Sequence, residues 1–367
     1  MAYTTIDDGS AHFEVTIWTG TGGARTISGL NHKPDLIWTK TRSVTYNHML
    51  SDSSRGFNAN SELGTNSSNI EGGLSAETYG YKSGHTSDGW TMVDGTDTVD
   101  GQEDGNTNQP SVTYVGWTWK ANGGTRTTFT ESGNNPGGGY QANTTGGFSI
   151  VDYTGTGSAG TVSHGLGAVP HWIVVKGREH SGGWITYHHK NTDAPETDIL
   201  EWQSTAATYD SNTYWNDTAP TSSVFTVNTS NDTNNDGNGL IAYVWTEIQG
   251  FSKFGRYTGN GNADGPFVYT GFKPKWLMIK RTNNTEHWKI NDTVRDYNGQ
   301  YGNDASLHPN QSIAETTSAS LNVDFLSNGF KLVTADGASN AVDAPFVYMC
   351  FAEHPFVSSK GVPATAR

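Results

Sequence analysis

The sharpest candidate for chemistry in this chain is a cluster of oxygen-bearing side chains. Asp232, Asn234 and Asp236 stand at alternate positions and are followed by Gly237. Oxygen ligands in this pattern before a glycine open a well-known type of Ca²⁺ loop. The motif is incomplete, because the twelfth position holds Tyr243 where such a loop supplies a bidentate glutamate. Asp, Asn and Gly between strands are also typical of ordinary turns, so a structural Ca²⁺ site and a plain turn are both open.

A second candidate site combines aromatic rings with polar side chains. Residues 209–216 read Tyr-Asp-Ser-Asn-Thr-Tyr-Trp-Asn. Sugar rings stack on exposed aromatic faces, and Asn and Asp bind hydroxyl groups. Tyr209, Tyr214 and Trp215 are therefore candidates for glycan contact. Core packing is the alternative, because most of the 12 tryptophans lie in strand-like runs.

The pattern of acids and histidines gives catalysis little support. Glycosidases need two carboxylates facing each other across a bond, and the acids here stand mostly in turns such as Asp88-Gly89. His188 and His189 follow a strand-like run, where adjacent side chains point to opposite faces and cannot bind one metal unless the backbone turns there. We expect no enzyme activity, and no cofactor other than a structural Ca²⁺.

Two acid–base pairs fit a structural role better than a ligand site. Asp52 precedes Arg55 by three residues, and Asp292 precedes Arg295 by the same spacing. A carboxylate and a guanidinium at this distance can form a clasp that fastens a loop.

One pattern occurs three times and predicts the elements that position these residues. Each copy has an aromatic-Thr-Gly-X-Gly turn, a proline, an apolar run that ends in lysine, and a closing aromatic strand. The turns begin at Trp18, Tyr153 and Tyr257, the lysines are Lys40, Lys176 and Lys280, and the closing strands begin near Tyr114, Ala242 and Phe346. The lysines are 136 and then 104 residues apart, so each copy is long enough to be a domain, unlike solenoid repeats of about 20–50 residues.

Composition predicts an all-β fold. Apolar residues stand in short β-branched and aromatic runs bounded by Gly, Asn, Asp and Pro, and only 16% of residues are charged. We expect three tandem antiparallel β-sandwich modules of a lectin-like or jelly-roll-like kind, each closing its own core. The expected boundaries are 1–120, 146–250 and 251–356, with a flexible Gly/Asn/Thr-rich linker at 121–145 and a flexible tail at 357–367.

Charge, cysteine usage and hydropathy narrow the partners. A formal net charge of −14 without a basic stripe disfavours nucleic-acid binding. No run approaches the roughly 18 apolar residues of a membrane span, and the first residues do not resemble a signal peptide, so we expect no membrane insertion. The single cysteine, Cys350, lies in an apolar run and is expected to be a core residue.

Several phrases resemble an uncharacterised repeat domain of structural proteins from marine tailed bacteriophages. They include Ala2-Tyr-Thr-Thr-Ile-Asp-Asp, Thr145-Gly-Gly-Phe-Ser-Ile-Val, Ala219-Pro-Thr-Ser-Ser-Val-Phe and Asp264-Gly-Pro-Phe-Val-Tyr-Thr-Gly-Phe-Lys-Pro. The resemblance covers nearly the whole chain and implies a virion component of the tail or fibre type. It supplies no established catalytic or binding residues.

The sequence therefore predicts a non-enzymatic virion protein of the tail-fibre or spike type, made in the host cytoplasm. Its expected partners are other virion subunits, further copies of itself, with a trimer suggested by analogy to phage fibres, and a host-surface glycan or protein. The alternative is a glycan-binding lectin whose main role is host recognition. A polysaccharide depolymerase is a third and more distant interpretation.

Overall fold

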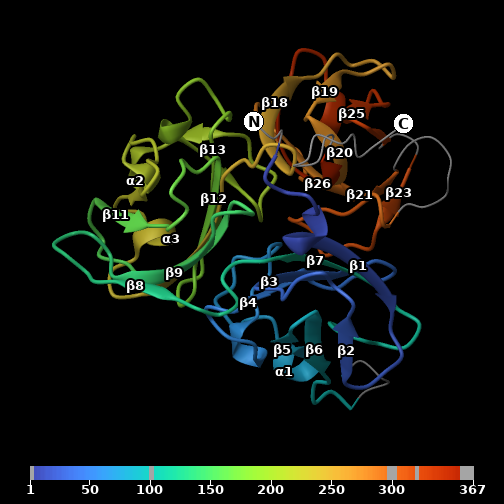
Figure 1. Cartoon of the computed structure of the whole chain (residues 1–367), viewed down its shortest axis with the longest axis horizontal. Helices are drawn as coiled ribbons and strands as arrows, with labels where there is room; N and C mark the ends of the chain where they lie inside the picture. The colour runs from blue at the N-terminus through green and yellow to red at the C-terminus, as the bar shows by residue number, and fades with distance from the viewer. Residues whose placement is uncertain (1–3, 99–102, 296–303, 319–321, 356–367) are drawn as a thin grey trace.

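Nearly all regular structure in the chain is antiparallel β-sheet, as the sequence predicted. The computed structural model describes residues 4–98, 103–295, 304–318 and 322–355 (Figure 1). Its helices are turns of three or four residues: η1 (Gly9–Ala11), η2 (Ala59–Ser61), α1 (Ala76–Tyr79), η3 (Pro195–Thr197), α2 (Asn212–Trp215), α3 (Asn231–Asn234) and α4 (Gly337–Asn340). Short β-branched and aromatic runs between turn residues give no length over which a longer helix could form.

Residues 13–119, which we call the first repeat, form a large and a small sheet. The strands are β1 (Phe13–Thr19), β2 (Arg25–Ser28), β3 (Leu36–Thr41), β4 (Met49–Asp52), β5 (Tyr81–Thr86), β6 (Gly89–Val93) and β7 (Thr113–Trp119). The large sheet has the order β1-β7-β3-β4, and the small sheet has the order β2-β6-β5.

The same strand order returns in residues 148–245, the second repeat. Its strands are β10 (Phe148–Thr154), β11 (Gly160–Ser163), β12 (Trp172–Gly177), β13 (Trp184–His188), β14 (Asp198–Glu201), β15 (Tyr209–Asp210), β16 (Val224–Val227) and β17 (Gly239–Trp245). The large sheet contains β10-β17-β12-β13, extended beyond β13 by β14 and β15, and the small sheet pairs β11 with β16.

Residues 252–355, the third repeat, follow this order again. Their strands are β18 (Ser252–Thr258), β19 (Phe267–Tyr269), β20 (Phe272–Arg281), β21 (Lys289–Asp292), β22 (Ala305–Ser306), β23 (Thr316–Thr317), β24 (Val323–Leu326), β25 (Gly329–Leu332) and β26 (Pro345–Pro355). The large sheet is β18-β26-β20-β21, the small sheet is β19-β25-β24, and β22 pairs with β23. The closing aromatic strands β7, β17 and β26 each pair on both sides, so they are central strands as expected.

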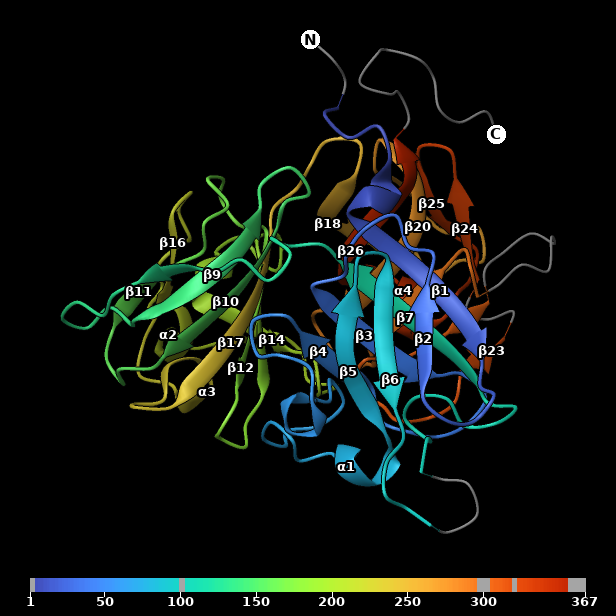
Figure 2. The same ribbon diagram turned by 60° about the horizontal axis from the view of Figure 1, so that its bottom comes forward.

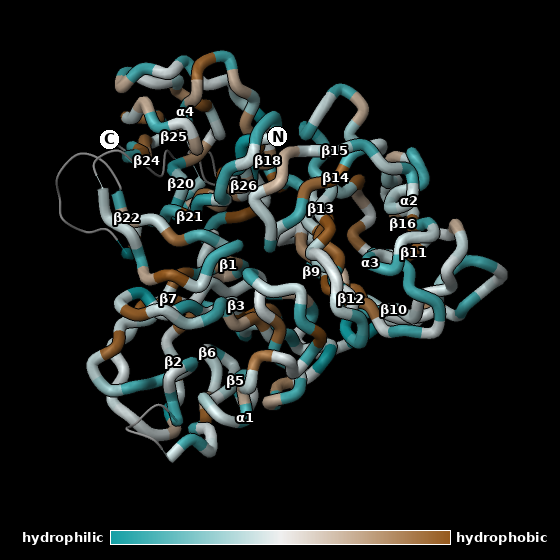
Figure 3. Tube along the Cα trace, turned by 180° about the vertical axis from the view of Figure 1, so that it is seen from behind, coloured by the Kyte–Doolittle hydropathy of each residue, from teal (hydrophilic) through white to brown (hydrophobic). Residues whose placement is uncertain are grey.

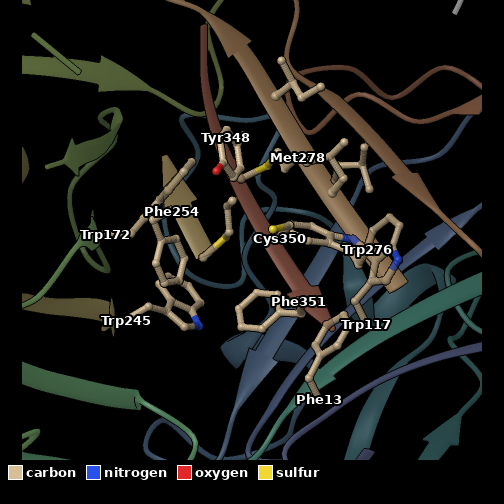
Figure 4. Packing of buried hydrophobic residues seen from close by; sticks show 14 of the residues in the cluster. Phe13, Trp117, Trp172, Trp245, Phe254, Trp276, Met278, Tyr348, Cys350 and Phe351 are labelled. Carbon is tan, nitrogen blue, oxygen red and sulfur yellow. The ribbon is translucent and has the colours of Figure 1, made fainter. Parts of the chain in front are cut away.

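One hydrophobic core joins the three repeats, which appear as three lobes around a common centre (Figures 1 and 2). Figure 4 shows side chains from all three repeats meeting beside β26. The core includes nine tryptophans: Trp38, Trp117, Trp119, Trp172, Trp184, Trp202, Trp245, Trp276 and Trp288. The expectation that each repeat closes its own core is therefore wrong. A smaller cluster does lie between the two sheets of the first repeat and of the second, but one face of each large sheet enters the shared core.

The burial of single strands explains this arrangement. Every residue of β3 and of β12 is buried, so both faces of these strands are covered. In β3, Ile37 faces the small sheet, whereas Leu36 and Trp38 enter the shared core. Figure 3 shows the same distribution, with hydrophobic colour along inner strands such as β12 and hydrophilic colour over many of the outer loops.

The stretch 121–145, expected to be a flexible linker, contains two strands instead. β8 (Thr127–Phe129) and β9 (Gly138–Asn143) extend the large sheet of the second repeat beyond β10. The stretch is also tied to the first repeat, because the Asp35 carboxylate accepts hydrogen bonds from the N–H groups of Ala121 (2.7 Å) and Gly123 (2.9 Å). Its Gly- and Asn-rich composition serves the turns between these strands. The expected tail at 357–367 lies outside the described residues.

Candidate functional site

The repeated aromatic-Thr-Gly-X-Gly motif forms a turn held by a buried asparagine. In the second repeat the Asn234 side chain accepts a hydrogen bond from the Thr156 N–H at 2.8 Å. The same amide donates to the carbonyl oxygens of Ser158 and Asn228, both at 2.7 Å. The Asn234 side chain therefore has both its acceptor and its donors satisfied inside the protein.

Asn108 and Asn340 hold the corresponding turns of the other two repeats. Asn108 accepts from the Thr21 N–H at 3.2 Å, and Asn340 accepts from the Asn260 N–H at 2.8 Å. The residue before each asparagine accepts a hydrogen bond from the aromatic residue that opens the motif. These bonds run from Trp18 Nε1 to Thr107 O (3.1 Å), from Tyr153 Oη to Thr233 O (2.6 Å) and from Tyr257 Oη to Ser339 O (2.6 Å).

The last glycine of each motif is required by the backbone. Gly22, Gly157 and Gly261 have φ values of 81°, 65° and 65°, a region that other residues rarely adopt. Sequence reasoning found the motif but missed the asparagines that bind it. The signal was a Thr-Asn or Ser-Asn pair five residues before each closing strand.

Two of the three predicted Ca²⁺ ligands have partners within the protein. Asn234 is buried and holds the turn, and Asp232 Oδ1 accepts from the Gly183 N–H at 3.1 Å. Asp236 is exposed. Among the described residues, no group of three or more His, Cys, Asp or Glu side chains is placed to hold a metal ion. The hydrogen bonds of Asn234 and Asp232 are those of a plain turn, and Ca²⁺ binding by this loop stays a prediction.

Of the three predicted glycan-binding residues, only the two tyrosines reach the surface. Trp215 is 2% exposed and belongs to the core between the sheets of the second repeat, so its ring cannot stack on a sugar. The tryptophan lies on the inner side of the short helix α2. Tyr209 is 37% exposed, and its hydroxyl lies 3.0 Å from the Tyr214 hydroxyl and 3.1 Å from Glu201 Oε1. Burial and these hydrogen bonds raise the pKa of Tyr209.

Sequence reasoning missed a larger aromatic surface on the small sheet of the third repeat. Phe267 and Tyr269 are 46% and 60% exposed, and the buried Val268 between them points inward. Tyr269, Gly329 and Leu326 form one row across this sheet. A Cβ atom on Gly329 would lie 2.1 Å from the Val268 carbonyl oxygen and 3.0 Å from two atoms of the Phe267 ring, so only glycine fits between the neighbouring backbone and this ring. The ion pair between Lys331 and Asp264 lies beside this surface, which we call the aromatic face.

The equivalent positions of the other repeats carry small hydroxyl side chains. Thr26 and Ser28 occupy them in β2, and Thr161 and Ser163 occupy them in β11. The fold therefore does not need aromatic rings at these positions. The sequence signal was that one repeat has aromatic residues where the other two have Thr and Ser. This difference becomes visible only once the strands are aligned by register.

The three repeats contact one another in a closed ring with equivalent seams. At the first–second seam, Trp184 Nε1 donates to Gly64 O at 2.9 Å, and at the second–third seam Trp288 Nε1 donates to Glu201 O at 2.8 Å. At the third–first seam, His48 Nε2 lies 2.9 Å from His308 O. In each case a segment of one repeat meets the residue that opens or directly precedes β4, β13 or β21 of the next repeat. The interfaces are therefore heterologous and close on themselves.

One backbone hydrogen bond also crosses each seam at an equivalent place. The N–H of Glu71 donates to Arg178 O (2.7 Å), that of Thr208 to Thr282 O (2.8 Å), and that of Glu315 to Arg42 O (2.7 Å). Buried lysines support two of these contacts, because Lys176 Nζ donates to Ser68 O and Lys280 Nζ donates to Thr205 O, both at 3.2 Å. Burial lowers the pKa of each of these two lysines to about 8.

The acid–base clasps expected from the sequence are present, and they strengthen two of the three seams. Asp292 Oδ2 lies 2.5 Å from Arg295 Nε and accepts from Trp117 Nε1 of the first repeat at 3.1 Å. Glu315 then bridges Arg295 (2.8 Å) and Arg42 (2.7 Å) across the third–first seam.

The first–second seam has the same network. Asp52 Oδ2 lies 2.6 Å from Arg55 Nε and accepts from the Tyr243 hydroxyl of the second repeat at 2.7 Å. Glu71 bridges Arg55 (3.3 Å) and Arg178 (2.5 Å). Both clasps are fully buried, which makes them structural rather than open to a ligand.

A surface cleft of about 420 Å³ lies next to the first–second clasp. Arg55, Asn58, Ile70, Glu71 and Arg178 contribute to its lining. The two arginines and Glu71 bind one another, and a second carboxylate of the lining, Glu179, accepts a hydrogen bond from the Gly239 N–H at 3.1 Å.

The expectations for the single cysteine and for membrane spans can also be compared with the structure. Cys350 is a buried free thiol in the shared core, as predicted, and burial raises its pKa. No helix within the described ranges is long and apolar enough to span a bilayer.

Comparison with known proteins places the chain in one family. A family model described as a domain of unknown function, DUF7483, matches residues 8–355, which include all three repeats. Neither the curated proteins nor the solved structures contain a match to the chain. The chain therefore belongs to the DUF7483 family.

Proposed function

We propose that the protein is a non-enzymatic structural subunit of a bacteriophage virion, of the tail-fibre or spike type. In this proposal each repeat is a β-sandwich module, with boundaries near 1–120, 146–250 and 251–356. The observation that carries it is the closed ring of equivalent seams around one aromatic core. A rigid scaffold of this kind suits a virion subunit, because it can hold the surface loops that contact partners in fixed positions.

The engagement of the ionisable side chains supports a structural role. The carboxylates of Asp52, Asp292, Glu71 and Glu315 are all bound to arginines. These carboxylates join the repeats to one another.

The test is to locate the protein on purified particles. Antibodies raised against the purified chain should label intact virions, and mass spectrometry should find the chain among virion proteins. The purified chain should not hydrolyse host polysaccharide. Absence from virions would overturn the proposal, and glycan turnover abolished by changing one carboxylate would favour the depolymerase.

The aromatic face favours a second candidate function, glycan binding for host recognition. Exposed Phe267 and Tyr269 rings beside Lys331 and Asp264 offer stacking surfaces next to polar groups. Titration with host-surface polysaccharide tests it. The variant Phe267→Thr/Tyr269→Ser should lose binding while keeping its fold, because the second repeat carries Thr161 and Ser163 at these positions. Equal binding by this variant would exclude the aromatic face.

A further inference from the structure

The three seams of the ring differ at one place. The positions of the clasp residues Asp52 and Arg55 hold His188 and Asn191 in the second repeat, as the pairing of β12 with β13 shows. Thr208 stands where the other seams have Glu71 and Glu315, and Thr282 stands where they have arginine. The second–third seam therefore has none of the charges of the clasp. Its corresponding contact is a single hydrogen bond from Thr208 Oγ1 to Asn191 Oδ1 at 2.7 Å.

Three histidines take the place of that network. His188 is buried, and its Nε2 lies 3.3 Å from Tyr348 O of the third repeat, while its Nδ1 accepts from the Lys190 N–H at 3.0 Å. His189 Nε2 lies 2.7 Å from Phe254 O, also in the third repeat. The His171 ring packs against the His189 ring, and the two ring centroids lie 4.4 Å apart.

These contacts determine which ring nitrogen of neutral His188 carries the proton. Because Nδ1 accepts a hydrogen bond, the ring proton lies on Nε2 and is donated to the carbonyl. A second proton on Nδ1 would face the Lys190 N–H and break that bond. The His171 Nδ1 accepts from the Glu247 N–H at 3.1 Å, so a proton there has the same effect.

Few charged groups surround the three histidines, and these groups have opposite signs. Glu247 Oε1 lies 3.9 Å from His189 Nε2, and the same carboxylate is paired with Lys253 at 2.9 Å. Lys190 adds positive charge beside His171 and His189. Trp172, Phe254 and Tyr348, which pack against the histidines from β12, β18 and β26, bring no charge at neutral pH.

We infer that the second–third seam is an acid-sensitive seam, which opens before the other two when the pH falls. The cluster of three histidines carries this inference, because it lies at an interface where the described residues form no buried clasp. The ion pair between Asp193 of the second repeat and Arg256 of the third is exposed to solvent, so it adds little to the stability of this seam. Opening leaves the first repeat clasped to both neighbours, while the second and third repeats separate about the short connection 246–251.

Acid destabilises the closed seam because its histidines bind fewer protons when the seam is closed than when it is open. Burial lowers the pKa of His188 and His171, and it lowers that of His189 to about 4, so the closed seam binds fewer protons than the open one. The open state takes up protons near the ordinary histidine pKa of about 6.5. The stability of the closed seam is therefore present above that pH and is lost as the pH falls toward 4.

The third–first seam provides an internal comparison. It also holds buried histidines, His48 and His308, but the Asp292, Arg295, Glu315 and Arg42 network spans it. At the first–second seam the histidine side chain, His180, is 33% exposed. Among the described residues, only the second–third seam combines a buried histidine, His188, and two half-buried ones with the absence of a clasp.

Hydrogen exchange of the three equivalent seam amides tests the inference directly. In the wild-type chain the amide of Thr208 should lose protection between pH 7 and pH 5, after correction for intrinsic exchange. The expected change is about tenfold per pH unit for each histidine that gains a proton on opening. The amides of Glu71 and Glu315 should keep their protection. Equal loss at all three amides, or earlier loss at Glu71 or Glu315, would overturn the inference.

Matched variants separate the clasp from the histidines. Glu315→Thr removes the bridging acid beside His48 and His308, so the amide at position 315 should become acid-sensitive. Glu71→Thr weakens the first–second seam without adding a buried histidine, so any loss of protection at position 71 should not depend on pH. Acid sensitivity at position 71 in this variant, or none at position 315 in the other, would contradict the inference.

Discussion

At the scale of single residues, the most informative side chains are three asparagines that bind turns. Asn108, Asn234 and Asn340 each hold the glycine-containing turn after the first strand of their repeat. A buried amide with several hydrogen bonds is costly to remove, because its partners lose their bonds without gaining water.

Replacing Asn234 should therefore destabilise the fold. Asn234→Ala leaves the Thr156 N–H and the carbonyls of Ser158 and Asn228 without their partner, and we expect a loss of about 3 kcal/mol in unfolding free energy. Urea denaturation measures it. Asp236→Ala, at an exposed position of the same loop, is the control and should leave the midpoint unchanged. A rise in stability on adding Ca²⁺ that Asp236→Ala removes would restore the metal interpretation.

The buried clasps should be much more sensitive than a surface ion pair. Asp292→Ala leaves the Arg295 guanidinium buried without its carboxylate, and such losses cost about 3–5 kcal/mol. The control is Asp193→Ala, because Asp193 is 99% exposed where it pairs with Arg256. Thermal unfolding should show a large drop for the first variant and none for the second. Equal midpoints would mean that the clasp does not join the repeats.

At the scale of elements, the main departure from the sequence prediction is the stretch 121–145. Its composition indicated a linker, but β9 pairs with β10 along six residues and also with β8. Gln141 is buried and donates to Ser54 Oγ of the first repeat at 2.7 Å. A Gly- and Asn-rich sequence can thus form an edge hairpin when a neighbouring sheet supplies the pairing partner.

Hydrogen exchange distinguishes a hairpin from a linker. Amides of residues 138–143 that bond to β10 should be protected at pH 7, whereas a flexible segment would exchange at its intrinsic rate. Limited proteolysis should give the same answer, with no early cleavage within 121–145. The loop 203–207 of the second repeat, which lies outside strands, serves as the comparison for the same digest.

At the scale of the whole molecule, the shared core makes the three repeats one cooperative unit. Trp38, Trp172 and Trp276 come from different repeats and lie in the same cluster. Removing one repeat would expose the tryptophans of the other two, and this loss of apolar burial opposes independent unfolding.

We therefore expect one unfolding transition at neutral pH. Tryptophan fluorescence and far-ultraviolet circular dichroism should give the same midpoint, and the calorimetric and van't Hoff enthalpies should agree. Two or three separated transitions would show that the repeats are independent domains. Sedimentation under the same conditions tests the proposed homo-oligomer, which the ring within one chain does not require.

The sequence by itself determined the features that depend on neighbouring residues. Alternation in runs such as Tyr114 to Trp119 predicted the closing strands, and the spacing of Asp292 and Arg295 predicted a clasp. Turn chemistry and period-two patterning are properties of a few consecutive residues, so they are visible before folding.

Tertiary structure alone decided which residues far apart in the sequence meet. The burial of Trp215, the exposure of Phe267, the role of Asn234 and the ring of seams all depend on contacts between separate segments of the chain, or on the register between strands. An aromatic residue in a strand-like run has the same local pattern whether its ring enters a core or faces water. The reason is that burial depends on which other segment covers the strand, and that choice is made by the packing of the whole chain.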